Sequence, residues 1–206
     1  MIQVIYQDEH LIAVNKPSGL LSVPGLSSDE NLLAEVLKEF PNGRTVHRLD
    51  MSTSGLVLFA LSYPAQKTLN HQFATRQIHK HYTAVVEGVL SADCGEINLP
   101  LICDWPNRPR QKVDWQCGKP ALTHFETLER RPALNQSLVA LYPITGRSHQ
   151  LRVHCLGINH PILGDQLYNL RDSHLGAPRL LLHATGISLS HPITREPLNI
   201  NCPPDF

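Results

Sequence analysis

The stretch HRLDMSTSGLVLFA, residues 47–60, places a histidine, an arginine and an aspartate directly before an unbroken apolar run. Asp50 stands two positions after Arg48, and the run from Leu56 to Leu61 is typical of a buried strand. An aspartate at the edge of such a strand either caps a turn or presents a carboxylate to a cleft. Taken alone, the stretch favours turn capping, so other parts of the sequence have to decide.

Two more polar clusters carry groups that could bind or react. RQIHKHYTAVVEG places Tyr82 early in a predicted strand, where filling the sheet is the favoured role of a lone tyrosine. WPNRPRQKVDW sets Arg108, Arg110 and Lys112 between two tryptophans. A short charge run of this kind is favoured as a solvated loop when nothing else is known.

A fourth cluster, GRSHQLRVH, predicts a helix on which His149 and Arg152 share one face. The polar residues alternate with Leu151 and Val153, so the polar face is not simply the face toward solvent. An exposed amphipathic helix and a functional helix are therefore equally favoured by the pattern.

Motifs of several other chemistries are missing. The sequence has no GxGxxG or Walker A pattern, so we expect no nucleotide cofactor. It has no HExxH motif, and His79 and His81 have no third ligand in view, so we expect no metal. A GxSxG nucleophile motif is also absent, although composition alone does not exclude a serine triad.

Composition indicates an ordinary globular protein. The 206 residues are 42% hydrophobic and carry 18 basic and 18 acidic side chains, so the net charge does not indicate a polyanionic partner. Five cysteines without CxxC spacing argue against disulfides or structural zinc, and we expect small buried thiols in a reducing compartment. Because no signal peptide or membrane-length apolar run is seen, we expect a cytoplasmic protein.

Hydrophobic periodicity and turn signals predict strands joined by both hairpins and helices. We expect helices over residues 30–40, 64–76 and 148–156, and an irregular segment over residues 91–120. Strands are expected at 2–6, 11–15, 56–61, 78–86, 123–128, 137–142, 180–188 and 198–200. This order predicts an α+β protein with a mixed, largely antiparallel sheet and flanking helices.

Read together, the clusters resemble the RluA-type pseudouridine synthases. HRLDMSTSGL is similar to their first signature, KHYTAVVEG to the second and PITGRSHQLRVH to the third, while RLLLHA at residues 179–184 resembles a late strand lining the same cleft. The motifs occur in family order over nearly the whole chain, with Ser148 where threonine is commoner. The resemblance implies a pseudouridine synthase fold with a central catalytic cleft. It also implies conversion of uridine in RNA to pseudouridine without a cofactor.

The resemblance also implies roles for individual residues. Asp50 would be the nucleophile, Arg152 would keep it ionised, and Tyr82 would stack on the target uracil and act as a base. Whether Asp50 attacks C1′, attacks C6 or supports a glycal-like route stays open. Arg48 would fill the space left by a flipped uridine. The expected RNA contacts are His47, Arg48, Arg108, Arg110, Lys112, Arg147, His149 and Gln150.

Within the family, the resemblance is strongest to members that modify a large-subunit rRNA stem-loop and the anticodon stem-loop of some tRNAs. We therefore expect RNA as the partner, without DNA or a membrane. We also expect one catalytic domain over residues 1–206, with two lobes sharing a sheet and no N-terminal S4-type domain. A monomer is expected because no coiled-coil pattern appears. Two alternatives remain, a catalytically silent RNA-binding module and a hydrolase with Asp50 as nucleophile.

Overall fold

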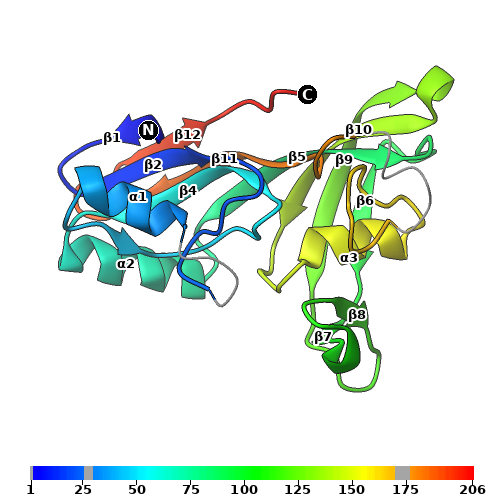
Figure 1. Ribbon diagram of the computed structural model, residues 1–206, viewed down its shortest axis with the longest axis horizontal. Helices are drawn as coiled ribbons and strands as arrows, with labels where there is room; N and C mark the ends of the chain where they lie inside the picture. Colours follow the sequence, from blue (N-terminus) through cyan, green and yellow to red (C-terminus); the bar gives the residue numbers. More distant parts are fainter. Residues whose placement is uncertain (1, 26–29, 170–176) are drawn as a thin grey trace. The chain divides into compact units, whose positions relative to one another are not determined.

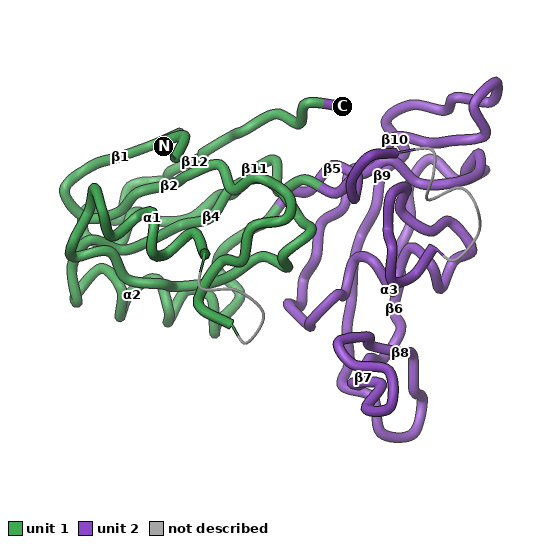
Figure 2. Tube along the Cα trace, in the orientation of Figure 1, with its two compact units in different colours: residues 1–80, 183–205 green, residues 81–182, 206 purple. Residues whose placement is uncertain are grey.

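The computed structural model describes residues 2–25, 30–169 and 177–206. The chain divides into two compact units (Figure 2), unit 1 with residues 1–80 and 183–205, and unit 2 with residues 81–182 and 206. It leaves unit 1 within strand β5 (His79–Glu87) and returns to it at the start of β11 (Leu182–Ser190). The predicted single catalytic domain with two lobes sharing one sheet stays a prediction, and the units are described separately below.

Unit 1 is built on a mixed sheet. Its strands run in the order β1 (Gln3–Gln7), β2 (Leu11–Lys16), β4 (Ser54–Ala60) and β11. β12 (Pro197–Asn201) pairs with β11, and β3 (Arg44–Thr45) pairs with β4. β4 and β11 are parallel, and the other pairings between the named strands of the unit are antiparallel. All seven residues of β4 are buried, as its continuous apolar run predicts.

The parallel pairing explains the glycine of the TSGL sequence. Gly55 has φ +108°, a region that residues with a Cβ rarely adopt. A Cβ built there would lie 2.4 Å from the carbonyl oxygen of Ala184, its partner on β11. Only glycine allows the two backbones to approach this closely, directly after the turn that carries Asp50.

The two helices of unit 1 begin where the capping signals predict. α1 (Leu32–Glu39) starts at Asn31, whose side chain accepts the Ala34 N–H at 2.9 Å, and it buries an apolar stripe. α2 (Tyr63–Ala74) has Ser62 as its N-cap and proline in its first turn, and it packs against β4. Both helices were predicted, with boundaries within two residues of those observed.

The described residues of unit 2 form an antiparallel sheet and one α-helix. The strand order is β5, β10 (Gln136–Pro143), β9 (Leu122–Arg131) and β6 (Cys94–Asn98). A separate hairpin of β7 (Leu101–Cys103) and β8 (Gln111–Val113) protrudes at the bottom of Figure 1. Short 3-10 turns, η1 (Trp105–Asn107) and η2 (Pro132–Leu134), lie in the connections. The predicted mixed and mostly antiparallel α+β architecture is confirmed.

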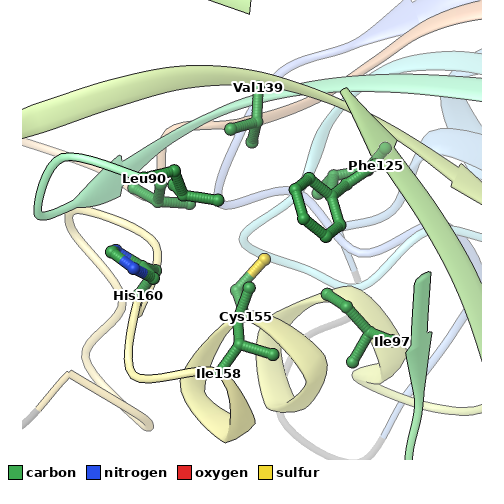
Figure 3. A pocket seen from close by; sticks show the side chains of 9 residues that line it. Leu90, Ile97, Phe125, Val139, Cys155, Ile158 and His160 are labelled. Carbon is green, nitrogen blue, oxygen red and sulfur yellow. The ribbon is translucent and has the colours of Figure 1, made fainter. Parts of the chain in front are cut away.

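The main core of unit 2 lies between this sheet and α3 (Gln150–Gly157). Val139 and Phe125 from the strands face Cys155 of α3 across a cavity of about 10 Å³ (Figure 3). Burial raises the pKa of the Cys155 thiol to about 12, so the group stays protonated and acts as a small apolar side chain. Tyr82 packs, half-buried, against the same core.

Two expectations need correction. Residues 91–120 are not irregular throughout, because they include the short elements β6, β7, η1 and β8. These strands are short and hold few β-branched residues, so local propensity does not reveal them. The cysteines are all free thiols, but only Cys155 and Cys202 are buried, whereas Cys94 and Cys117 are exposed. Cys94 lies on the face of β6 that it shares with exposed Glu96 and Asn98, and Cys117 lies in an exposed turn.

Candidate active site

Asp50 lies in a turn, residues 47–53, that ends where β4 begins; we call it the Asp50 loop. The hydroxyl of Ser22 donates to the carbonyl of Leu49 at 2.8 Å and accepts its N–H at 3.0 Å. The hydroxyl of Ser18 donates to the carbonyl of Ser52 at 2.7 Å. Backbone on both sides of Asp50 is therefore held by side chains from a segment about thirty positions earlier.

Lys16, the last residue of β2, is buried and bonds to the backbone of the same loop. Its side chain is 0% exposed, and its ammonium donates to the carbonyls of Met51, Pro17 and Leu20 at 3.0, 2.9 and 2.8 Å. Burial lowers the pKa of Lys16 to about 8, and the nearby charge of Asp50 opposes that shift. At neutral pH a buried cation on β2 therefore lies against the loop that carries the predicted nucleophile.

His47 has a structural task at the start of the loop. Its Nε2 accepts the N–H of Leu58 on β4 at 2.9 Å, so the ring proton lies on Nδ1, and the ring packs on Phe73 of α2. Burial and the charge of Lys80 lower the pKa of His47 to about 3. This neutral, hydrogen-bonded ring favours a positioning role, so the predicted contact of His47 with RNA stays a prediction. The neighbouring Arg48 is exposed, as expected for such a contact.

The late strand motif RLLLHA contributes His183. Its Nδ1 lies 2.9 Å from the Ser54 hydroxyl, and its Nε2 lies 3.0 Å from the Cys202 carbonyl. The carbonyl only accepts, so Nε2 carries the ring proton and Ser54 donates to Nδ1. His183 thereby ties the first residue of β4 to β11 and to the C-terminal segment. This explains the serine of TSGL as a structural residue.

Arg152, on α3, is held by an acidic partner in unit 2. Its Nε and Nη2 each donate to a carboxylate oxygen of Asp165 at 2.7 Å, and the two side chains are 4% and 1% exposed. The guanidinium also lies over the ring of Tyr168, 5.0 Å from its centroid. A bidentate buried pair and an aromatic face together set the orientation of Arg152.

The three predicted RNA contacts shortly before Arg152 differ in how far they are exposed to a ligand. Arg147 is exposed and donates to the Pro120 carbonyl at 3.2 Å. Gln150 is 4% exposed, and its amide makes four hydrogen bonds with surrounding groups. His149 is half-buried in a left-handed conformation at the N-cap of α3. The fully used amide favours Gln150 as a positioning residue, and its predicted RNA contact stays a prediction.

The β7–β8 hairpin presents the cationic and aromatic residues predicted for RNA binding. Trp105 and Trp115 are 67% and 73% exposed, and the Arg108 guanidinium lies 4.6 Å from the Trp105 ring centroid. Arg108 and Lys112 are exposed, and Arg110 is half-buried. Exposed tryptophans beside cations suit stacking on unpaired bases and contact with phosphates.

The predicted site residues therefore form two groups. His47, Arg48 and Asp50 lie together in unit 1, whereas Tyr82, Arg152 and the other predicted contacts belong to unit 2. That the two groups act on one substrate stays a prediction.

Sequence reasoning missed Lys16, Asp165, Tyr168 and His183 as supporting residues. Each lies far along the chain from the residue it supports or in a segment without periodicity. Lys16 alone among them has a local sequence signal, because it is a charged residue at the end of an apolar strand.

No group of three or more His, Cys, Asp or Glu residues within the described ranges is arranged to hold a metal ion. The helices in this part of the chain are all too short or too polar to cross a membrane.

Comparison with known proteins identifies the family. The family described as RNA pseudouridylate synthase matches residues 10–156. The dual-specificity RNA pseudouridine synthases RluA of Haemophilus influenzae and Pasteurella multocida are 50% and 51% identical to this chain, covering 100% of it and 94% of each relative. The solved structure of human RNA pseudouridylate synthase domain containing 1 is similar with a TM-score of 0.85 at 28% identity, covering 100% of this chain and 84% of that one. The chain therefore belongs to the RNA pseudouridylate synthase family and is an RNA-modifying isomerase.

Proposed function

We propose that this enzyme converts specific uridines to pseudouridine in a stem-loop of large-subunit rRNA and in the anticodon stem-loop of some tRNAs. The relatives from Haemophilus influenzae and Pasteurella multocida are named as dual-specificity enzymes, which supports two RNA classes. The observation that carries the catalytic part is the Asp50 loop, which is fixed by buried Ser22 and Lys16. A fixed carboxylate beside a polar turn suits a nucleophile better than a solvated cap.

The reaction rearranges bonds within one nucleoside. The N1–C1′ bond of uridine breaks, the uracil turns, a C5–C1′ bond forms, and the proton on C5 is transferred to N1 through the enzyme and solvent. We assign Asp50 as the group that attacks the substrate, at C1′ or at C6, or that supports a glycal-like route. No external oxidant or water is consumed, because the product has the mass of the substrate.

Arg152 has the role of keeping the Asp50 carboxylate ionised during this reaction. A guanidinium stays protonated across the working pH range, so it stabilises an anion without competing for its proton. Asp165 supports this role because it takes two of the N–H donors of Arg152 and thereby sets the plane of the guanidinium. Conservative replacement of Arg152 by lysine loses this planar geometry.

Tyr82 has two separable roles, stacking on the target uracil through its ring and removing the C5 proton through its hydroxyl. Its position early in β5 and its partial burial against the unit 2 core support these roles, because they restrict where the ring can lie. We expect Tyr82→Phe to retain RNA binding and to accumulate an adduct with Asp50. Turnover of Tyr82→Phe equal to that of the parent would exclude the hydroxyl as the base.

RNA binding is assigned to exposed arginines and lysines and to the hairpin tryptophans. The target uridine must leave its stack before it can react, at a cost of a few kcal/mol. Arg48 is exposed next to Asp50 and is the candidate to occupy the vacated space. The neutral net charge means that affinity depends on local basic patches, which predicts a steep loss of affinity with salt.

Nucleoside analysis tests the proposal directly. The parent protein and Asp50→Asn are incubated with a large-subunit rRNA stem-loop and with a tRNA anticodon stem-loop, and the digested nucleosides are separated by retention and mass. The parent should yield an isomer of unchanged mass, and Asp50→Asn should lower kcat by roughly 10⁴-fold or more with RNA affinity largely retained.

The same measurement separates the alternatives. A silent RNA-binding module returns only uridine, and a hydrolase yields free uracil, an abasic site or a cleaved strand. Conversion of one stem-loop but not the other would restrict the enzyme to a single RNA class. We further propose a cytoplasmic monomer, which light scattering of the purified protein and imaging of the tagged chain would check.

A further inference from the structure

We propose that Tyr168 is a positioning residue that couples the RNA-binding β7–β8 hairpin to Arg152. The inference rests on the proposed function, because it assumes that the hairpin grips RNA and that Arg152 serves the reaction. It goes further in assigning a physical link between the two. All residues involved belong to unit 2 and to the described part of the chain.

The hydroxyl of Tyr168 connects two elements. It accepts the backbone N–H of Gln111, the first residue of β8, at 2.7 Å. The same oxygen lies 2.7 Å from Nδ1 of His149, the N-cap of α3. Because the N–H of Gln111 only donates, the Tyr168 hydroxyl accepts there and its own proton can go to Nδ1 of His149. The hydroxyl thus joins the end of the hairpin tip to the start of the helix that carries Arg152.

The ring of Tyr168 makes a different contact. It is 7% exposed, and the Arg152 guanidinium lies 5.0 Å from its centroid. The ring also packs with Val153 of α3 and with Leu101 of β7 in a small second core of unit 2. The buried side chain of Tyr168 therefore packs with both the β7–β8 hairpin and α3, the helix that carries Arg152.

Asp165 fixes Tyr168 and Arg152 together. Its Oδ1 accepts the backbone N–H of Tyr168 at 3.2 Å and that of Leu167 at 2.9 Å, while both carboxylate oxygens pair with Arg152. A displacement of Tyr168 thus moves a turn whose capping carboxylate also orients the guanidinium. This arrangement gives a mechanical route from hairpin to Arg152 through contiguous buried contacts.

Two substitutions separate the functions of Tyr168. Tyr168→Phe keeps the ring beneath Arg152 and removes the hydroxyl that links Gln111 to His149. It should raise the KM for a stem-loop RNA by about five- to tenfold, the lower end of the effect of two lost hydrogen bonds, with kcat changed less than about twofold. Tyr168→Leu removes the ring as well, so kcat should also fall. Tyr6→Phe is the matched control, because it removes a tyrosine hydrogen bond, to Asp8 at 2.6 Å, in unit 1.

A double-mutant cycle distinguishes coupling from simple loss of structure. RNA dissociation constants are measured for the parent, Tyr168→Phe, Arg108→Ala and the double variant. If Tyr168 positions the hairpin, Arg108→Ala should weaken binding by a clearly smaller factor in the Tyr168→Phe background than in the parent. If Tyr168 merely supports the fold, the two factors should multiply independently, and Tyr6→Phe should resemble Tyr168→Phe after the two are matched for Tm.

The outcomes remain separable from those of the proposed function. Multiplicative effects, or an unchanged KM in Tyr168→Phe while the parent isomerises RNA, would overturn the coupling and leave the function intact. A parent that converts no RNA would overturn the function and the coupling with it. Should Tyr168→Phe fail to fold, Leu101→Ala replaces it in the cycle, because Leu101 of β7 belongs to the same small buried core as the Tyr168 ring. Independent effects there would equally refute the link.

Discussion

The Asp50 loop and the tip of the β7–β8 hairpin are two polar turns with arginines, yet they are held in opposite ways. Met51 and Leu49, the neighbours of Asp50 in its loop, bond to Lys16 and Ser22, which lie 35 and 27 positions away in the chain. The hairpin tip closes on itself, with the Asn107 N–H bonded to the Asp104 carbonyl at 2.9 Å. The Asp50 loop is fixed by side chains from outside it, whereas the hairpin tip closes through its own backbone and is tied to another segment at its end, where the Gln111 N–H bonds to Tyr168.

Their side chains differ accordingly. Around the Asp50 loop, the supporting Lys16 is fully buried, whereas at the hairpin Trp105 and Trp115 are mostly exposed. A reacting atom must be held within a fraction of an ångström, which requires support from surrounding buried groups. A surface that grips varied RNA backbones benefits from exposed cations and aromatic faces that adapt to the partner. The comparison teaches that similar residue types serve chemistry or binding according to how their backbone is anchored.

The largest expected difference in stability is between two lysine-to-methionine substitutions, one beside the Asp50 loop and one in the β7–β8 hairpin. Lys16→Met removes the donor to three part-buried carbonyls, and each hydrogen bond lost from this charged donor costs about 1 kcal/mol or more. We expect the free energy of unfolding to fall by at least about 3 kcal/mol, with a lower kcat because the Asp50 loop shifts. Lys112→Met, on exposed β8, should change stability by less than about 0.5 kcal/mol and weaken only RNA binding.

Urea unfolding and steady-state kinetics check this pair of variants. Equal stability losses in Lys16→Met and Lys112→Met would remove the distinction between the two turns. A stable Lys16→Met with normal kcat would show that the three carbonyls are satisfied in another way and that the loop does not depend on the lysine.

A smaller effect is expected from pH. The pKa of His47 is about 3 in the folded chain and about 6.5 in the unfolded chain. Between these two pH values the unfolded chain therefore binds a proton that the native chain does not. The stability contributed by the neutral ring is present above pH 6.5 and is lost as the pH falls below it. At pH about 5 the loss should reach about 2 kcal/mol relative to pH about 7.

His47→Gln provides the matched control, because the amide oxygen can accept the Leu58 N–H but does not titrate in this range. Urea unfolding of both proteins at the two pH values isolates His47 from other histidines, such as His81 and His154, whose pKa values burial also lowers. Parallel pH profiles for parent and His47→Gln would contradict the assignment. Arg108→Ala in the hairpin should keep the parental profile.

Much of the fold follows from local patterns. The apolar run of β4 and the capping residues Asn31 and Ser62 predict a strand and two helices close to their observed ends. The three strands between residues 91 and 120 were missed, because β6 buries only Ile97 and β7 and β8 have three residues each. Their stability comes from pairing with β9 or with each other, which local propensity does not contain.

The site shows the same division. Motif resemblance predicted catalytic roles for Asp50, Tyr82 and Arg152, but it did not predict which residues hold their backbones and side chains in place. Asp165 lies thirteen positions after Arg152, in a turn without periodicity, and only the folded chain brings the two carboxylate oxygens onto the guanidinium. For Gln150 the sequence predicted an RNA contact, which stays a prediction, and the folded chain shows that each hydrogen-bonding group of its amide is used within the protein. Residue type predicts capability, and burial decides how that capability is used.

The smallest expected effect concerns one charge at the hairpin tip. Arg108 is exposed and stacks on Trp105 at 4.6 Å, so it can contact a phosphate while supporting the ring. Arg108→Ala should raise the dissociation constant for a stem-loop RNA only a few-fold at moderate salt, without a change in Tm. It should also reduce the slope of log affinity against log salt by about 0.7–0.9, the value for one lost phosphate contact.

Arg108→Lys sharpens this measurement, because it keeps the charge and loses the planar group that stacks on the Trp105 ring. Its salt slope should match the parent, while its affinity falls slightly through weaker stacking. Fluorescence anisotropy of a labelled stem-loop over a salt series gives both quantities for the three proteins. An unchanged slope in Arg108→Ala would mean that Arg108 does not meet phosphate, and the hairpin would then bind RNA through its tryptophans alone. Unlike Lys16, where one side chain supports a whole loop, Arg108 should alter binding only through its own contact.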